Sequence, residues 1–428
     1  MKNQICLVFA LLVLCSSSFA QNIESILDSL SGLYAFNYEK MKVDSMFEEK
    51  YLLNFEQAAD PYNPEGLKFN QRVFVSHLDF NAPVVFITEG YSASGAENTH
   101  FISELAALLH TNQICVEHRY FGTSKPDTLK WEHLTVANAA ADHHRIVEVL
   151  KLIYPGKWIG TGISKGGQTA IFHRYFYPED VDISVPYVAP LNFSTEDQRI
   201  YTFLDSVGQK DCREHIFQFQ KELLQHKNKY ISEFEILAKK RKLTYPMDLN
   251  KAFELVVLEY SFAFWQWGYF DCDNIPNDFT DPKSIITHLD KVAGIKWVSN
   301  EGIKELQPFF YQAMREIGFY GYNIEPFKTW TVYQENPTFE FTLPEGVSIE
   351  FEPQLMQEVG CFLRHEADNM IFIYGEYDPW SAPAVELTQH TNSIKVVKPG
   401  GNHRTRINNL SKEQQNLVME TLQKWLLE

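Results

Sequence analysis

Short, largely apolar runs recur along the chain and alternate with stretches of helical periodicity. Each run spans four or five residues, which is the length of a buried strand rather than of a buried helix. The runs lie at 84–88, 113–117, 157–161, 370–374 and 394–397, with an alternating strand at 67–77 and helical stretches at 101–110 and 137–153. Residues 22–60 are amphipathic and are predicted to be partly helical. Continuous apolar strands separated by helices predict an α/β core with a doubly wound, mostly parallel sheet.

The alternation of strand and helix breaks after residue 191 and resumes after residue 361. Between these points the sequence is first charged and helical, at 221–242, and then aromatic, at 262–267 and 309–311. We interpret the span as a mainly helical cap inserted into the core, and a separate second domain is the alternative. The predicted parts are a first core segment at 21–191, the cap at 192–361 and a second core segment at 362–428.

The first 20 residues have the layout of a secretion signal. Lys2 precedes an apolar run at 5–14, and small residues follow up to Ala20, after which cleavage is expected. Cys15 could instead accept a lipid, but the bulky Leu14 does not suit such a site. No other stretch approaches the roughly 20 apolar residues that span a bilayer. We therefore expect a secreted or periplasmic protein whose mature chain has no membrane span.

The balance of charged residues argues against one large class of partner. The 428 residues include 38 Lys and Arg against 55 Asp and Glu, which gives a formal net charge of −17. Nucleic-acid binding depends on a basic surface that displaces counterions, so DNA or RNA is not the expected ligand. Hydrophobic residues make up 45% of the chain, which is typical of a globular protein.

A candidate nucleophile lies in a glycine-rich turn between a strand and a helix. The segment Gly162-Ile163-Ser164-Lys165-Gly166 follows the predicted strand at 157–161 and precedes a helical stretch at 168–177. This G-x-S-x-G pattern in a strand-turn-helix context is the nucleophile elbow of an α/β-hydrolase core. Glycines are needed because strand and helix approach closely, and the sharp turn lifts the Ser164 hydroxyl above the sheet. An ordinary turn serine is the alternative.

A serine hydroxyl needs a base to take its proton and an acid to orient that base. In this architecture the acid and the histidine follow the serine in chain order, each just after a late strand. Asp378 follows the strand at 370–374, and His403 lies in a glycine-rich loop after the strand at 394–397. Asp368 precedes its strand and Glu376 comes very early in its loop, so both are weaker candidates. We predict a triad of Ser164, Asp378 and His403.

The negative oxygen that forms during acyl transfer needs two backbone N–H donors. The N–H of Lys165, directly after the nucleophile, is the first expected donor. The second should come from the loop after an early strand, where Gly90 and Tyr91 follow the strand at 84–88. Either of these two residues could supply it.

Several of these motifs resemble the S37 serine peptidases, a family of secreted tripeptidyl aminopeptidases. The resemblance rests on 156–167 and 187–190, and three further stretches at 117–122, 378–381 and 401–403 resemble both S37 and the related S28 prolyl carboxypeptidase and dipeptidyl-peptidase group. At the elbow, Lys165 stands where the S28 group usually has tyrosine, which favours S37. The resemblance implies a serine exopeptidase that releases short peptides, expected to be tripeptides, from free N-termini through an acyl-enzyme. It implies no cofactor.

Three other functions fit parts of the same pattern. An esterase or lipase would use the same triad, because the triad does not specify an ester or an amide. A dipeptidyl or prolyl-type peptidase would match the motifs that are shared with S28. A catalytically silent secreted binding protein is the least expected, because the serine, the acid, the histidine and the glycine-rich turn are all present.

An aminopeptidase must hold a free ammonium group at a fixed distance from its serine, and a partly desolvated carboxylate is the natural partner. Glu89, beside the predicted oxyanion loop, is one candidate, and a structural ion pair with Arg119 is its alternative role. Trp265 and Trp267 belong to an aromatic cluster that could wall a substrate cleft. The alternative is that this cluster forms the core of the cap.

Four cysteines remain once the predicted signal is removed: Cys115, Cys212, Cys272 and Cys361. Charged neighbours suggest that Cys212 and Cys272 lie in surface loops, and we predict that they form a disulfide, with free thiols as the alternative. No cysteine has the spacing of a zinc site. His143 and His144 are interpreted as part of a solvated helix face, so no metal is expected.

Overall fold

The computed structural model describes residues 22–428, so the predicted secretion signal and Cys15 lie outside the described residues. Within that range nine strands form one sheet in the order β1-β2-β3-β5-β4-β6-β7-β8-β9. The strands are Phe36–Met41 (β1), Glu49–Ala58 (β2), Lys68–His77 (β3), Val84–Thr88 (β4), Asn112–Val116 (β5), Trp158–Ile163 (β6), Ile183–Tyr187 (β7), Ile371–Gly375 (β8) and Ile394–Lys398 (β9). Strands β1, β2, β3 and β5 pair antiparallel, and the pairings from β5 to β9 are parallel.

Both faces of the central sheet are covered. Along β4, Val84 and Phe86 pack into one apolar cluster, whereas Val85 and Ile87 pack into another on the opposite face. Helices α1 and α3 contribute to the first cluster, and α2 and α12 contribute to the second. A strand with both faces buried has no polar side, which explains its continuous apolar sequence. The prediction of an α/β-hydrolase fold, a doubly wound and mostly parallel sheet, is confirmed.

The N-terminal region differs in part from its prediction. Residues 23–34 form a helix as expected, but residues 36–58 form the antiparallel pair β1 and β2. Buried and less buried positions alternate along much of β2, which is the period of a half-buried strand. The sequence changes from a helical period at 23–34 to a strand period in β2, and interpreting the whole of 22–60 as one amphipathic segment missed this change.

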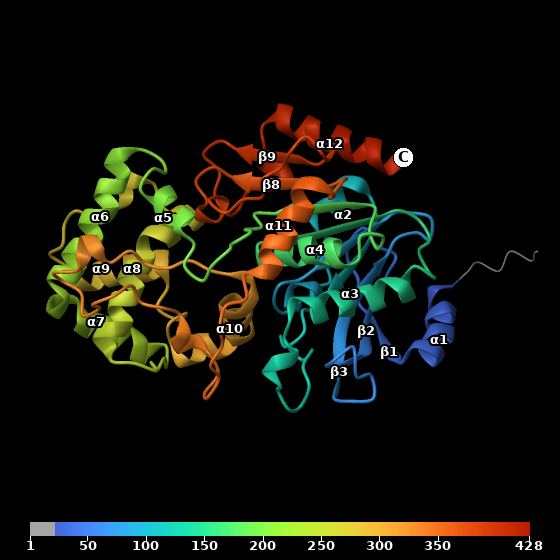
Figure 1. Cartoon of the computed structure of the whole chain (residues 1–428), viewed down its shortest axis with the longest axis horizontal. Helices are drawn as coiled ribbons and strands as arrows, with labels where there is room; N and C mark the ends of the chain where they lie inside the picture. The colour runs from blue at the N-terminus through green and yellow to red at the C-terminus, as the bar shows by residue number, and fades with distance from the viewer. Residues whose placement is uncertain (1–21) are drawn as a thin grey trace, which may run out of the picture.

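A mainly helical segment lies between β7 and β8. The α-helices of the chain are Ile23–Tyr34 (α1), Glu104–Leu109 (α2), Val136–Leu150 (α3), Lys165–Phe176 (α4), Gln198–Leu204 (α5), Lys210–Gln225 (α6), Lys227–Lys240 (α7), Leu249–Trp267 (α8), Pro282–Ala293 (α9), Asn300–Gln312 (α10), Gln354–His365 (α11) and Lys412–Leu427 (α12). Helices α6 to α9 gather in a lobe beside the sheet, whereas α11 lies next to α4 (Figure 1). The predicted end of the cap at residue 361 therefore falls inside a helix that packs against the core. In residues 22–428 no helix is both long and apolar enough to cross a membrane.

The two adjacent histidines of α3 have different surroundings. His143 is fully buried, with its ring 6.0 Å from that of Phe86, so its interpretation as part of a solvated face is wrong. The helix lies on the sheet, and every third or fourth residue therefore points inward. His144 is partly exposed and lies 2.9 Å from a carboxylate oxygen of Asp180. Burial holds the pKa of the His143 imidazole well below its usual value, so this ring is neutral.

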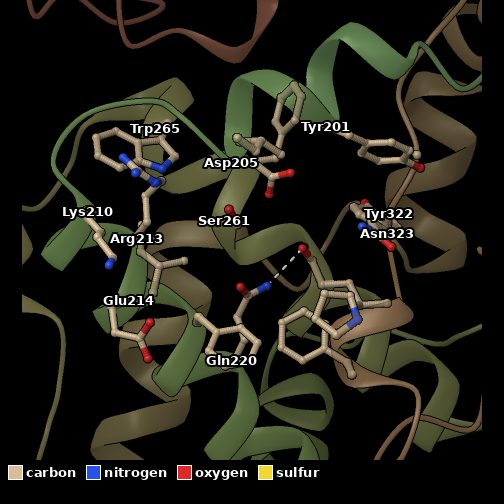
Figure 2. Close-up of a pocket in the computed structure, with 18 residues that line it drawn as sticks. Tyr201, Asp205, Lys210, Arg213, Glu214, Gln220, Ser261, Trp265, Tyr322 and Asn323 are labelled. Carbon is tan, nitrogen blue, oxygen red and sulfur yellow. Dashed lines mark hydrogen bonds between the residues drawn. The ribbon is translucent and has the colours of Figure 1, made fainter.

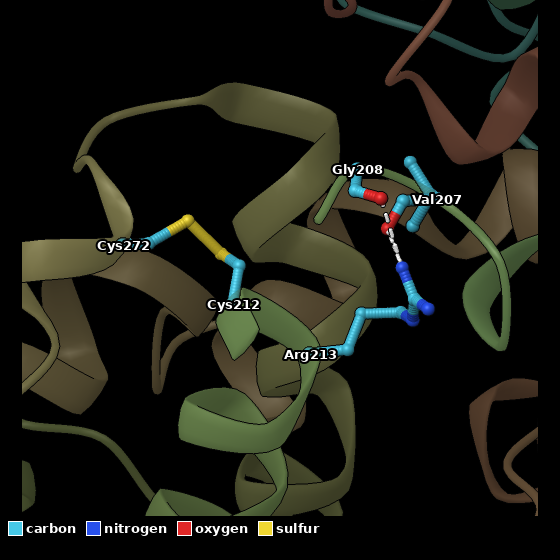
Figure 3. The surroundings of a disulfide bond; sticks show 5 residues. All are labelled: Val207, Gly208, Cys212, Arg213 and Cys272. Carbon is cyan, nitrogen blue, oxygen red and sulfur yellow. Dashed lines mark hydrogen bonds between the residues drawn. A yellow bond between two sulfur atoms is a disulfide. The ribbon is translucent and has the colours of Figure 1, made fainter. Parts of the chain in front are cut away.

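A disulfide joins Cys212 to Cys272 across a sequence separation of 60 residues (Figure 3). Cys212 is buried within α6, contrary to its predicted place in a surface loop, because the apolar face of this helix turns toward α8. Beside it, the Arg213 guanidinium donates to the carbonyls of Val207 and Gly208, at 2.8 and 2.9 Å. The disulfide and this arginine together fix the start of α6 within the cap.

Replacing both Cys212 and Cys272 with serine is expected to lower the free energy of unfolding by up to about 4 kcal/mol, because a loop of this length is no longer closed in the unfolded chain. Urea unfolding of the double variant, followed by tryptophan fluorescence, measures the change. Cys361→Ser is the matched control, because Cys361 is an exposed free thiol. Equal stability of the double variant and the control would contradict the expectation.

Candidate active site

Ser164 stands at the turn between β6 and α4 in a strained backbone conformation. Its φ is 56° and its ψ is −122°, values that a non-glycine residue rarely adopts. The turn is held by two backbone hydrogen bonds, from the Ser164 N–H to the Tyr187 carbonyl and from the Gln168 N–H to the Ser164 carbonyl, each 2.9 Å. The strain is typical of a nucleophile elbow, because it exposes the hydroxyl above the sheet.

The glycines on either side of Ser164 are required by close backbone contacts. A Cβ on Gly162 would lie 2.2 Å from the Gly166 carbonyl oxygen. A Cβ on Gly166 would lie 2.7 Å from the carbonyl oxygen of Thr88, at the end of β4. Both distances are shorter than atoms can approach, so any side chain here would push α4 away from the sheet and displace Ser164.

Asp378 and His403, predicted on separate loops, meet beyond the ends of β8 and β9. His403 Nδ1 lies 2.6 Å from Asp378 Oδ2, and both side chains are buried. The second carboxylate oxygen of Asp378 accepts from the Trp380 N–H at 3.2 Å, which fixes its orientation. Since the carboxylate accepts the proton on Nδ1, the Nε2 atom of His403 is left as the basic nitrogen. The competing acids lie elsewhere: Asp368 accepts from the Asn392 N–H and Glu376 from the Gly400 N–H.

The cap contributes directly to the position of His403. The His403 N–H donates to the carbonyl of Gln266 at 2.9 Å, and the Asn402 side-chain amide donates to the carbonyl of Trp267 at 3.2 Å. Gln266 and Trp267 form the last turn of α8. The Trp267 ring also packs edge to face against His403, with centroids 5.6 Å apart. The histidine is thus held between the core and the end of a cap helix.

The loop after β4 packs directly on the elbow. A Cβ on Gly90 would lie 2.6 Å from the Gly166 nitrogen, so the two backbones touch. Within residues 22–428 neither the Gly90 nor the Tyr91 N–H donates a hydrogen bond, and the same holds for the N–H of Lys165 at the start of α4. The side chain of Lys165 is buried, with its ammonium 5.8 Å from the centroid of the Tyr91 ring. Unpaired N–H groups beside the serine suit the binding of a developing oxyanion.

Ser164 opens into a cleft of about 260 Å³ between the core and the cap. Its walls are mostly aromatic and apolar, and the polar residues among them include Gln168 and Glu259. The lining residues include Tyr91, Lys165, Asn192, Gln266, Trp267, Trp297, Leu306, Phe309, Phe310, Phe319, Tyr320, Phe339 and Trp380. The two aromatic clusters singled out from the sequence thus both contribute to this cleft, through Trp267 and through Phe309 and Phe310.

Trp265 lies elsewhere. It lines a different cavity of about 370 Å³ within the cap, formed between α5, α6, α8 and residues 321–327 (Figure 2). Ser261 lies one turn before it on α8 and lines the same cavity, as does Arg213 of α6. Successive residues of a helix point about 100° apart, so Trp265 and Trp267 face different sides of α8. Of these two predicted substrate contacts, the structure therefore brings only Trp267 to the cleft of Ser164.

Glu89 is half-buried beside the Gly90 loop, but it does not line this cleft. Its carboxylate accepts from the Cys115 thiol at 3.7 Å, and burial raises its pKa to about 7. The alternative role as an ion-pair partner of Arg119 is not realised, because the Arg119 guanidinium lies 2.6 Å from Asp142. Glu89 is thus near the elbow without facing the space that a substrate would fill.

Glu259 of α8 was not among the candidates from the sequence, yet it lines the cleft of Ser164. It is buried and accepts from the hydroxyls of Tyr320 and Tyr322, both at 2.8 Å. No Lys, Arg or His within residues 22–428 forms an ion pair with it, and burial raises its pKa to about 7. The only sequence signal is an acid within an apolar helical run. Glu254, one turn earlier, gives the same signal but pairs with Lys227.

Comparison with known proteins identifies the family. The sequence model of PS-10 peptidase S37 matches residues 19–426. The chain belongs to the S37 peptidase family. The prolyl tri/tetrapeptidyl aminopeptidase of Streptomyces mobaraensis is 30% identical to this S37 chain over 384 residues, which is 88% of this chain and 80% of the relative. The human lysosomal Pro-X carboxypeptidase is 31% identical over 157 residues, covering 33% of this chain and 32% of the relative. Among solved structures, proline iminopeptidase of Mycobacterium smegmatis matches with 13% identity over 83% of this chain and 96% of the other, at a TM-score of 0.39.

The predicted resemblance to S37 is therefore confirmed, and so is the class of enzyme. This S37 chain is a serine peptidase, and its similarity to an aminopeptidase over most of both chains supports an exopeptidase. Similarity to a prolyl carboxypeptidase is confined to about a third of each chain.

Proposed function

We propose that this S37 peptidase removes short peptides, expected to be tripeptides, from free N-termini through an acyl-enzyme on Ser164. The observation that carries the proposal is the buried carboxyl of Glu259 in the same cleft as the serine. An exopeptidase that acts at N-termini needs one fixed anionic group on the acyl side, and Glu259 supplies it. The name of the Streptomyces relative supports release of three or four residues.

The proposed chemistry uses Ser164 as the nucleophile, His403 as the general base and Asp378 as the acid that orients it. His403 Nε2 takes the proton from the serine hydroxyl as the oxygen attacks the scissile carbonyl, and Asp378 stabilises the imidazolium. The resulting oxyanion is held by the N–H of Lys165 and by that of Gly90 or Tyr91. His403 then returns the proton to the leaving nitrogen, and water releases the acyl group by the same steps in reverse.

The substrate ammonium would take the position opposite Glu259. The hydroxyls of Tyr320 and Tyr322 both donate to Oε2 of Glu259 and so orient the carboxylate, but they carry no positive charge. An ammonium group in this apolar cleft would therefore form a strong, charge-assisted hydrogen bond with it. Because the distance between this anchor and Ser164 is fixed, it would limit how many residues lie before the cleaved bond. A cleft of about 260 Å³ accommodates only a short segment.

Glu259→Gln is expected to lower kcat/KM for a free tripeptide amide by about 100-fold, because the substrate ammonium would lose its buried counter-charge. The N-acetylated form of the same substrate has no ammonium and should be cleaved equally by both proteins. Glu89→Gln is the matched control variant, since Glu89 also has a raised pKa but does not face the cleft. If kcat/KM fell strongly in Glu89→Gln and not in Glu259→Gln, Glu89 and not Glu259 would be the partner of the substrate ammonium.

The same anchor gives an expected dependence on pH. With its pKa near 7, Glu259 is protonated and neutral at pH 6 and ionised at pH 8. The ratio of kcat/KM for the free peptide to that for the N-acetylated peptide should therefore rise from pH 6 to pH 8. Any group that acts on both substrates alike changes both values by the same factor, so its contribution cancels in the ratio. Glu259→Gln should show a flat ratio over this range.

We also propose that the protein is exported, as the layout of residues 1–20 predicts. The disulfide between Cys212 and Cys272 supports this, because such bonds persist mainly in oxidising compartments. An exported exopeptidase would act on peptides outside the cytoplasm. Fractionation of cells that produce the full-length chain, with N-terminal sequencing of the product, tests both export and the expected cleavage after Ala20.

A further inference from the structure

Three side chains form a continuous strip on the rim of the active site, beginning at His403. The Trp267 ring meets His403 edge to face, Tyr269 stacks near Trp267 with centroids 6.2 Å apart, and the Arg404 guanidinium lies 4.3 Å above the centroid of Tyr269. We call Trp267, Tyr269 and Arg404 the rim platform. Trp267 lines the cleft, whereas Tyr269 is half exposed and Arg404 is exposed. The platform thus leads from the reacting groups outward to solvent.

The platform is held in place by the contacts that position His403. Gly268, between its two aromatic residues, ends α8 with φ of 56°, and a Cβ there would lie 2.2 Å from the Asn402 side-chain nitrogen. The same Asn402 amide donates to the Trp267 carbonyl, and its carbonyl oxygen accepts from the Arg404 N–H at 2.9 Å. Asn402 therefore fastens both halves of the platform to each other. Such a strip is ordered before a ligand arrives, which lowers the entropic cost of binding.

The chemistry of the reaction decides which part of a substrate lies on this side. The histidine returns its proton to the leaving nitrogen, so the residues after the cleaved bond must depart past His403. The acyl part, anchored at Glu259, lies in the cleft between core and cap. A chain that leaves past His403 meets Trp267 first, then Tyr269 and Arg404. Aromatic faces bind peptide backbone and side chains of many kinds, whereas a guanidinium selects for an anion.

Arg404 has no acidic partner of its own. No carboxylate within residues 22–428 lies within salt-bridge distance of it, although the chain carries 55 acidic residues. An excess of negative charge, −17 overall, repels acidic peptides at long range. A single unpaired arginine that is fixed on the rim would attract an acidic peptide locally and so offset this repulsion. Its planar fork matches a carboxylate in particular.

We propose that the rim platform is the binding subsite for the leaving peptide and that Arg404 recognises a carboxylate on it. The carboxylate would be an acidic side chain soon after the cleaved bond or, in a short substrate, the free C-terminus. This inference rests on the proposed exopeptidase function, because it assumes a peptide that leaves past His403. Arg404 is then a specificity residue that contacts the substrate away from the reacting atoms.

The test uses peptides with one common N-terminal tripeptide. Three pairs carry Glu or Gln at the first, second or third position after the cleaved bond, and a fourth pair ends in a free carboxylate or in an amide. The wild-type protein should prefer the carboxylate member of at least one pair by about threefold in kcat/KM at low salt, mainly through KM. The preference should fade as salt rises, because the arginine is exposed. The pair that shows the preference tells whether Arg404 recognises an acidic side chain or the C-terminal carboxylate.

Arg404→Gln should abolish that preference, and Tyr269→Leu should reduce it, because the guanidinium then loses its support. Lys424→Gln, which removes one positive charge from α12, is the matched control and should keep the preference. A tripeptide arylamide with an uncharged leaving group measures the basal activity: Lys424→Gln should cleave it at the wild-type rate, and Arg404→Gln should lose less activity on it than on the preferred carboxylate peptide. The inference is overturned if the wild type shows no preference in any pair, or if Arg404→Gln retains it. If the wild type cleaved none of the free-N-terminus peptides, the proposed function itself would be wrong.

Discussion

Replacing Ser164 with alanine is expected to lower kcat for a free-N-terminus peptide by about 10⁶-fold, because the proposed acyl-enzyme forms on the oxygen of this hydroxyl. The surrounding turn should persist, since its hydrogen bonds come from the backbone of residue 164 and not from the side chain. Quantitative peptide hydrolysis measures the loss. Labelling by a fluorophosphonate probe, which reacts only with an activated serine, should disappear in parallel.

Ser261→Ala is the matched control for this experiment. Ser261 lies in the cap, where it lines the cavity of Trp265 and not the cleft of Ser164 (Figure 2). Its variant should be labelled by the probe and should hydrolyse peptides at the wild-type rate. Thermal unfolding of both variants shows whether either loses its fold. Undiminished labelling of a folded Ser164→Ala protein would reject Ser164 as the nucleophile.

Asp378→Asn should reduce kcat by about 10⁴-fold while leaving KM nearly unchanged. The asparagine amide would present a donor to His403 Nδ1, which now lies 2.6 Å from a carboxylate oxygen. The ring would then carry its proton on Nε2, which is the nitrogen that must accept the proton of Ser164. Initial rates over a range of substrate concentrations separate the two kinetic constants.

The two competing acids supply the controls for Asp378. Asp368→Asn and Glu376→Gln each remove a negative charge from the same region, but their carboxylates accept backbone N–H groups at 2.8 and 2.6 Å and do not face His403. Each should keep at least a third of wild-type activity. If one of them lost more activity than Asp378→Asn, the assignment of the orienting acid would be wrong.

The features that were predictable from sequence are those that local patterns specify. A strand with both faces covered is mostly apolar, so β4 and β8 could be found directly. The elbow was also visible, because its close backbone contacts admit only glycine at Gly162 and Gly166. Asp378 and His403 could be chosen because the sheet topology places them in loops after late strands. Their meeting at 2.6 Å agrees with that choice.

Residues whose environment depends on the packing of distant helices were not predictable in this way. Glu254 and Glu259 look alike in the sequence, as acids in an apolar helix. The difference arises from partners far along the chain: Lys227 neutralises Glu254, whereas Tyr320 and Tyr322 leave Glu259 without a cation. The rotation of α8 likewise separates Trp265 from Trp267, and no local pattern reports that rotation.

The hydrogen bond from the His403 N–H to the Gln266 carbonyl limits how this enzyme could be rebuilt. Caps of α/β enzymes are often regarded as modules that can be exchanged to change specificity while the core retains its chemistry. Here the last turn of the cap helix α8 also supports His403, the proposed general base. A replacement cap would have to present a carbonyl group at the position of the Gln266 carbonyl. The last turn of α8 would therefore have to be kept when the rest of the cap is exchanged.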